Sequence, residues 1–277
     1  MSIAKKTILM VVLVTIALFS LVYTISNFIY LRGFEELENH QVERSVTQVA
    51  EVISVKMNAL DAFCHDWAYW DDTYRFAQDR NPDYVSKNLL DDTLINGDIN
   101  IFIVLNLQGE VIYGKAFDLS IKKETGLPGD MNNLLSSPAL ADILEKQGEM
   151  LGITTLSGYP TGISVRPILT SLIEGPAAGY LVVGRYFDTS FTSYLSATAH
   201  LSVSLLETEP AGTDPGLEKI IKELTDPEKI YLEVESNKII SGYSMMNDIG
   251  GKPVLIYKVS LPRDIYIQGL KAIAYFH

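Results

Sequence analysis

The sequence predicts an α+β domain that is tied to a membrane by an N-terminal helix. Three observations support this. An apolar run without any charged residue fills 7–31, an apolar stripe at helical spacing follows from Val42 to Trp67, and short runs rich in β-branched and aromatic residues begin after residue 98. Helical periodicity followed by antiparallel strand patterns, with the helices on one side of the sheet, is typical of an α+β domain.

The apolar run predicts an uncleaved transmembrane helix over 7–31. Its 25 residues exceed the roughly 20 that a spanning helix needs, whereas a signal peptide has a shorter apolar region and a small-residue cleavage site. Lys5 and Lys6 precede the run, and Glu35 and Glu36 follow it. The lysine and arginine bias therefore places the tail 1–6 in the cytoplasm and everything from residue 32 outside it. The lipid bilayer is thus an expected partner, crossed once by this chain.

The next segment predicts a long amphipathic helix over 32–80. Apolar residues recur every three or four positions, at Val42, Val46, Val49, Ile53, Met57, Leu60, Cys64 and Trp67. Such a stripe must be covered, either by the chain's own folded domain or by a second copy of the helix. We expect a homodimer, although packing on its own domain would satisfy the stripe equally well.

The rest of the chain alternates short helices and strands. Pro82 predicts a turn at 79–84, and two β-type runs around a Gln-Gly turn predict a hairpin over 99–117. The further elements are expected in this order: a helix at 83–95, short helices within 129–148, strands at 152–170 and 175–187, a helix at 187–201, a strand at 202–207, a loop at 209–216, a helix at 217–226 and strands over 230–262.

Composition excludes several classes of function. The net charge of −12 argues against nucleic acid binding, which needs clustered lysine and arginine. Cys64 is the one cysteine, and the four histidines lack metal-ligand spacing, so we expect no disulfide within the chain, no metal site and no cofactor. Neither GxSxG nor GxxxxGK[ST] occurs, and we expect no catalytic residues.

Four segments together resemble a known family: "HDWAYWDDTYRFAQDRNPDYVSKNL", "INIFIVLNLQGEVIYG", "GYLVVGRYFD" and "IGGKPVLIYKVSLPRDIYIQG". They are similar to the fourth class of CHASE domains, which are extracellular sensor modules of bacterial and archaeal signalling receptors with Cache-type, PAS-like folds. The resemblance spans roughly 55–270. It implies a sensor core over 81–195, a membrane-proximal α/β segment over 196–265, and a histidine kinase or diguanylate cyclase output, but it does not identify the ligand. The closing run 269–276 is apolar except for Lys271. It predicts the start of a truncated second membrane helix over 266–277, with a short helix that packs on the domain as the alternative.

The stretch 65–74, "HDWAYWDDTY", is the first candidate site. If it continues the helix, Asp71 falls inside the apolar stripe, where a carboxylate needs a partner. Arg166 and Arg185, on predicted strands, are the candidates. Trp67 belongs to the stripe itself, Trp70 and Tyr74 flank it, and Asp66 and Asp72 lie on its margins. We interpret the stretch first as a structural joint that clamps the helix onto the sheet, with the rim of a ligand pocket as the alternative.

The second candidate site follows from the resemblance, which implies a pocket over the sheet. Tyr113, Tyr159, Arg166, Arg185 and Tyr186 are strand residues that would suit the binding of a small molecule. The alternative is that these are ordinary edge-strand tyrosines and solvated arginines. The sequence thus predicts a sensor that binds an unknown small molecule and transmits a conformational change. The competing interpretation is a membrane-anchored ectodomain for structure or protein interaction, without such a ligand.

Overall fold

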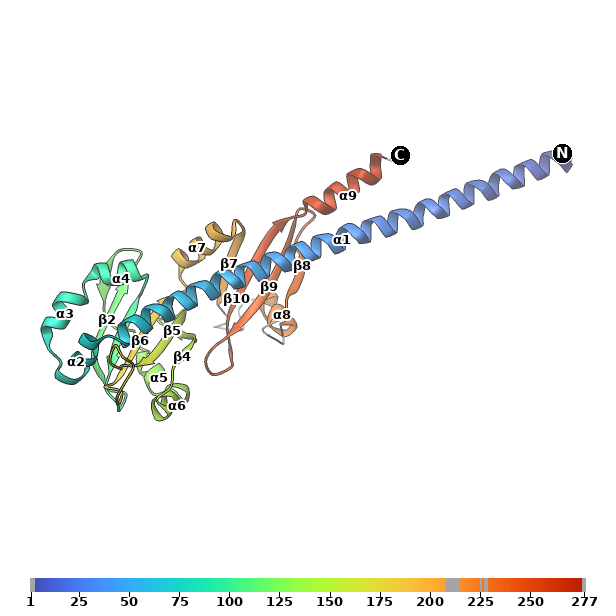
Figure 1. The fold of residues 1–277 in the computed structure, drawn as a ribbon. Coiled ribbons are helices and arrows are strands. Elements are labelled where there is room, and N and C mark those ends of the chain that lie inside the picture. Colours follow the sequence, from blue (N-terminus) through green and yellow to red (C-terminus); the bar gives the residue numbers. More distant parts are fainter. Residues whose placement is uncertain (1–2, 208–214, 225, 227–228, 276–277) are drawn as a thin grey trace.

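The molecule is built along one helix, α1 (Ile3–Ala68), which carries two antiparallel sheets side by side (Figure 1). The structure is a computed structural model that describes residues 3–207, 215–224, 226 and 229–275. The fold class is α+β, as predicted. The six-stranded sheet lies at the C-terminal end of α1, and the four-stranded sheet lies nearer its middle (Figure 1).

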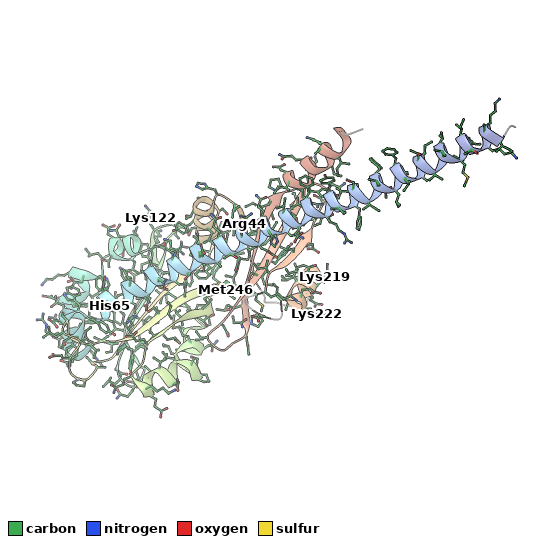
Figure 2. The ribbon with its side chains drawn as sticks, turned by 45° about the vertical axis from the view of Figure 1, so that its right-hand side comes forward. Arg44, His65, Lys122, Lys219, Lys222 and Met246 are labelled. Atoms are coloured by element: carbon green, nitrogen blue, oxygen red, sulfur yellow. The ribbon has the colours of Figure 1, made fainter. Side chains whose placement is uncertain are left out.

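The N-terminal part of α1 stands clear of every other element (Figure 2). Its large apolar side chains are exposed, and within the described residues α1 is the one helix long and apolar enough to cross a membrane. The hydroxyl groups of Thr7, Thr15 and Thr24 each donate a hydrogen bond to the carbonyl four residues earlier. The polar side-chain groups of these residues are thereby satisfied within the helix, which is what a lipid environment requires.

The second part of α1 buries its stripe against the chain's own sheets. Val42, Val46, Val49 and Ile53 are almost fully buried in one core with the four-stranded sheet. Glycine permits this close approach: a Cβ on Gly242 would lie 2.6 Å from Val46 Cγ2. Packing on its own domain therefore covers the stripe, and the homodimer stays a prediction.

The six-stranded sheet is antiparallel throughout, in the order β3-β2-β1-β6-β5-β4. The predicted hairpin is confirmed as β1 and β2, joined by a turn that Asn106 and Glu110 close with a backbone hydrogen bond. The strands are β1 (Ile101–Leu105), β2 (Val111–Asp118), β3 (Lys123–Thr125), β4 (Met150–Leu156), β5 (Tyr159–Pro167) and β6 (Tyr180–Tyr186).

Helices cover both faces of this sheet, whereas the sequence pattern predicts them on one side. Phe102 and Val104 of β1 pack toward α1, α2 (Asp71–Asp79) and α3 (Pro82–Asn88). Ile101 and Ile103 point to the opposite face because side chains alternate along a strand. There they meet α5 (Met131–Leu135) and α6 (Pro138–Lys146).

The four-stranded sheet has the order β7-β10-β9-β8 and is reached through α7 (Thr189–Ala199). Its strands are β7 (Ser202–Glu207), β8 (Tyr231–Val234), β9 (Ile239–Asn247) and β10 (Pro253–Pro262), and α8 (Pro215–Glu223) packs beside it. Most of the loop expected at 209–216 lies outside the described residues.

The prediction of one helix over 32–80 is wrong beyond Ala68. Trp70 is extended, with φ −117° and ψ 129°, and α2 then begins at Asp71. No proline or glycine causes the break. Instead, the carbonyl of Ala68 accepts a hydrogen bond from the backbone N–H of Leu169 at 3.1 Å, a tertiary contact that replaces the helical one. The predicted helix at 83–95 is likewise two helices, α3 and α4 (Asp91–Gly97).

The final helix, α9 (Asp264–Tyr275), follows β10 directly. It contacts α1 and leaves the four-stranded sheet in the direction in which the N-terminal part of α1 extends (Figure 1). Its 12 residues are too few to span a bilayer by themselves. A second membrane helix beginning at 266–277 stays a prediction.

Candidate functional site

The structure distributes the predicted site residues over three places rather than one. The stretch 65–74 forms the corner between α1 and α2. Arg166 lies under the last turns of α1, and Arg185 lies with Tyr159 and Tyr186 near the start of α7. Tyr113, on β2, belongs with the corner: it packs edge-on against Phe76 of α2 at 6.1 Å, in the same core cluster as Trp67 and Trp70.

The tryptophans join the corner to the sheet. The ring of Trp67 stacks on Phe63 at 5.7 Å and meets the edges of Trp70 at 5.5 Å and Phe102 at 5.6 Å. Trp70 in turn lies 6.0 Å from Tyr84 of α3. These aromatic contacts connect α1, the α1–α2 corner, α3 and β1, and offset or edge-on geometries of this kind are favourable.

The expectation that Asp71 is buried and paired with an arginine is wrong. Asp71 is exposed, and its Oδ1 accepts a hydrogen bond from the backbone N–H of Ser171 at 2.9 Å. The reason is the end of α1 at Ala68, because the helical projection no longer holds beyond it. Asp66 and Asp72 are paired with His65 and Arg75 near the surface, and the Tyr74 hydroxyl donates to the Pro176 carbonyl.

Arg166 is paired with Asp61, which the sequence reasoning missed. Its Nε and Nη2 lie 3.0 and 2.7 Å from the two carboxylate oxygens, and Nη1 lies 2.7 Å from Glu149 Oε1. Burial raises the pKa of Asp61, but the hydrogen bonds from Arg166 and Ser164 outweigh this and hold the pKa below its usual value. A signal was present: Asp61 lies four residues after Met57 and three before Cys64, inside the stripe.

The strongest candidate for a ligand site is a cleft beside the tyrosine pair. The rings of Tyr159 and Tyr186 lie 5.8 Å apart, and the cleft has a volume of about 350 Å³. That size lies within the range for small-molecule sites. The remaining lining residues are mostly polar: Asn100, Asp118, Ser120, Thr125, Gly126, Ser157, Asp188, Thr189 and Ser190. We name this space the tyrosine cleft.

The charged side chains that line the tyrosine cleft are carboxylates, and one of them, Asp188, lies 3.5 Å from Nη1 of the buried Arg185. The lining includes Asp118 and Asp188 and, within the described residues, neither lysine nor arginine. The hydrogen bond from the Ser120 hydroxyl to Asp118 is the main reason why the pKa of Asp118 is below its usual value. Burial raises the pKa of Tyr186. The ring of Tyr186 is therefore a neutral face, and Asp118 is ionised at neutral pH.

Arg185 connects the floor of the cleft to α1. It is buried, and it donates to Asn100 Oδ1 at 3.0 Å and to Ser190 Oγ at 2.9 Å, two residues that line the cleft. On its other side it donates to Asp98 Oδ1 at 3.0 Å, and Asp98 Oδ2 is 2.9 Å from Lys56 Nζ of α1. We refer to this chain of hydrogen-bonded charged groups, which connects the cleft lining to α1, as the buried relay.

The acids of the tyrosine cleft have structural partners. The described residues hold no group of three or more metal-ligating side chains. The two acids of the tyrosine cleft cap helix α7 and a turn: Asp188 Oδ1 accepts from Phe191 N, and Asp118 Oδ1 accepts from Ser120 N. The arrangement can orient a small molecule by hydrogen bonds and aromatic contact.

Known proteins agree with this fold. The extracellular domain of a protein described as the histidine kinase vpHK1S-Z8 superposes with a TM-score of 0.50 at 10% identity, covering 86% of this chain and 95% of that one. A domain of a sensory box/GGDEF family protein from Vibrio parahaemolyticus gives 0.53 at 10% identity, with 86% and 99% covered. At such low identity these likenesses concern the fold alone.

Sequence comparison identifies the family of this chain. The methanogenesis regulatory histidine kinase FilI of Methanothrix harundinacea (strain 6Ac) is 24% identical over 241 residues, which is 86% of this chain. The chain spans about a quarter of the length of that relative, 26%. The model of the CHASE4 domain matches residues 52–206, more than half of the chain. The chain therefore belongs to the CHASE4 family of sensor domains.

Proposed function

We propose that this chain is the extracytoplasmic sensor module of a membrane signalling receptor and that it binds a small molecule in the tyrosine cleft. The observation that carries the proposal is the polar cleft of about 350 Å³ whose floor is tied to α1 through Arg185. The exposed apolar surface of α1 between Ile8 and Tyr30 supports a membrane anchor. A kinase or cyclase output would belong to a longer receptor.

The lining suggests the chemistry of the ligand. Two carboxylates, an amide and several hydroxyls accept hydrogen bonds, and two tyrosine faces border them. A small polar molecule with hydrogen-bond donors, and preferably a positive charge, suits this lining, because cations are attracted both to carboxylates and to aromatic faces.

Transmission would run through the buried relay. A ligand that rearranges Asn100 or Ser190 changes the hydrogen bonds of Arg185, and Arg185 shares Asp98 with Lys56 of α1. We expect bound ligand to alter amide hydrogen exchange in α1 around Lys56. In Asp98→Asn the ligand should still bind, but this remote change in exchange should be lost.

A thermal-shift screen of small polar metabolites against the detergent-solubilised chain tests ligand binding, because binding to the folded state raises Tm. Tyr159→Ala should abolish the shift given by a hit, and Tyr194→Ala, which removes a similarly exposed tyrosine on α7, should retain it. If hits survive Tyr159→Ala unchanged, the tyrosine cleft is the wrong site. If no metabolite shifts Tm, the ectodomain without a small-molecule ligand becomes the better interpretation.

A further inference from the structure

A buried ion pair joins the two helices that leave the domain on the same side. Nε and Nη2 of Arg263 both lie 2.9 Å from Oε2 of Glu38, although the two residues are 225 positions apart in the chain. Glu38 is 3% exposed and Arg263 is 7% exposed. An ion pair shielded from water to this extent is expensive to separate.

The pair lies where both helices leave the folded domain, in the middle of α1 and just before α9. Glu38 follows the apolar segment of α1, and Arg263 is the residue before α9. The backbone N–H of Arg263 donates to the Lys238 carbonyl, in the turn between β8 and β9, and its carbonyl accepts from Ile267 N in the first turn of α9. A movement of the four-stranded sheet must therefore move Arg263 and the start of α9 together.

Only one of the two carboxylate oxygens of Glu38 takes part in the ion pair. Both donors of Arg263 use Oε2, and Glu38 Oε1 is buried without a hydrogen-bond partner in the described part of the chain. A buried acceptor left unpaired is unfavourable. Guanidinium and carboxylate groups also form a forked pair that uses both oxygens. A small shift of α9 relative to α1 would convert the one-oxygen arrangement into the forked one.

The neighbouring contact between the helices permits such a shift. A Cβ on Gly269 of α9 would lie 2.4 Å from Cδ2 of Phe34 of α1, so the backbone of α9 packs directly on the ring. A glycine surface lets two helices approach closely and has no side chain that interlocks with the partner. The ion pair lies close to this contact, because Glu38 follows Phe34 by one turn of α1.

We propose that Glu38 and Arg263 form a latch that sets the register of α9 against α1, with the one-oxygen and forked pairings as its two positions. The latch goes beyond the proposed function because it requires no ligand and no particular site in the distal domain. It gives the domain a discrete mechanical connection from its second sheet to both helices, and a two-position element is what a switching transition needs.

Distance measurements between spin labels on α1 and α9 test the latch. The full chain is placed in lipid nanodiscs, the buried Cys64 is replaced by alanine, and labels are attached at Leu37→Cys and Lys271→Cys, both at exposed positions. The variant is Glu38→Gln, and the matched control is Glu36→Gln, the same change at an exposed position of α1. We expect Glu38→Gln to broaden the distance distribution, and Glu36→Gln to leave it as in the parent chain.

A second variant distinguishes a change in the register of α9 against α1 from a loss of folding stability. In Glu38→Met combined with Arg263→Met, no buried charge is left alone, so the fold is retained even if Glu38→Gln weakens it. The latch predicts a normal Tm for the double variant together with a broadened distribution. If the folded double variant keeps the distribution of the parent chain, the ion pair does not set the register and the proposal is overturned. This outcome would not bear on ligand binding in the tyrosine cleft, because the ligand-induced change in Tm is measured in a separate experiment.

Discussion

Two carboxylates attach α1 to the rest of the chain: Asp61 lies inside the apolar stripe, and Glu38 lies one turn before its first residue, Val42. Asp61 binds Arg166 of β5, and Glu38 binds Arg263 beside α9. Both could be found from the sequence, because each is spaced like the apolar residues around it. Their arginine partners could not be found, since the pairing depends on how the strands are placed. The prediction that Asp71 is buried and paired with an arginine is wrong because it required α1 to continue past Ala68.

The Asp61–Arg166 pair should contribute measurably to stability. Asp61→Asn removes the charge that receives two hydrogen bonds from Arg166 and one from Ser164. We expect a loss of about 2 kcal/mol in the free energy of unfolding, in line with charged hydrogen bonds. Urea unfolding of the detergent-solubilised chain, followed by tryptophan fluorescence, measures it. Asp66→Asn, at an 80% exposed side chain, is the control and should be nearly neutral; equal midpoints for both variants would remove Asp61 from this role.

The same pair gives a pH dependence of known sign. The pKa of Asp61 is lower in the folded chain than its ordinary value of 3.8, so the unfolded state binds the proton more readily. The stabilisation is fully present well above 3.8 and is lost as the pH falls through the lowered folded value. The stability difference between wild type and Asp61→Asn should therefore be constant near neutral pH and shrink below about pH 4. A difference that grows on acidification would contradict the assignment.

Cys64 should not react with thiol reagents in the folded protein. It is fully buried between α1 and the sheet, near the carbonyls of Ser164 and Leu181, and burial raises the pKa of its thiol to about 12. Because the thiolate is the reactive form, a thiol reagent at pH 8 should label Cys64 only after urea is added. Rapid labelling of the native chain would show that α1 separates from the sheet.

At the scale of elements, the predictable parts were those with strong local patterns. The amphipathic helix and the β1–β2 hairpin have clear periodicity and turn residues. The end of α1, the short strand β3 and the division into two sheets have no such local signal. The break after Ala68 depends on a hydrogen bond from Leu169, about a hundred residues later. Only the assembled fold specifies it.

The contact between α1 and the four-stranded sheet depends on Gly242. A Cβ there would lie 2.6 Å from Val46 Cγ2 and 2.7 Å from Val42 Cγ1, in a fully packed core. Gly242→Ala should lower stability by about 1–3 kcal/mol through overpacking, as measured by urea unfolding. Gly129→Ala, where nothing lies within 4 Å of the added Cβ, is the matched control. A neutral Gly242→Ala would mean that α1 packs more loosely on this sheet than the structure shows.

At the scale of the whole molecule, one helix connects everything. The apolar part of α1 lies at its N-terminal end, the lining of the tyrosine cleft is linked to α1 through Arg185, Asp98 and Lys56, and α9 packs against α1 (Figure 1). The overall class and the membrane segment followed from hydropathy and periodicity alone. The location of the cleft did not, because it is formed by residues from five separate stretches of the chain.

The central claim is that the folded domain lies outside the cytoplasm while the N-terminus lies inside. In the Cys64→Ala background, single cysteines are introduced at Lys222, exposed on α8 (Figure 2), and at Lys5, before the apolar run. A membrane-impermeant maleimide is then added to intact bacterial cells that express each chain. The account predicts labelling of Lys222→Cys in intact cells and of Lys5→Cys only after lysis. The reverse pattern, or protection of Lys222→Cys until lysis, would contradict it.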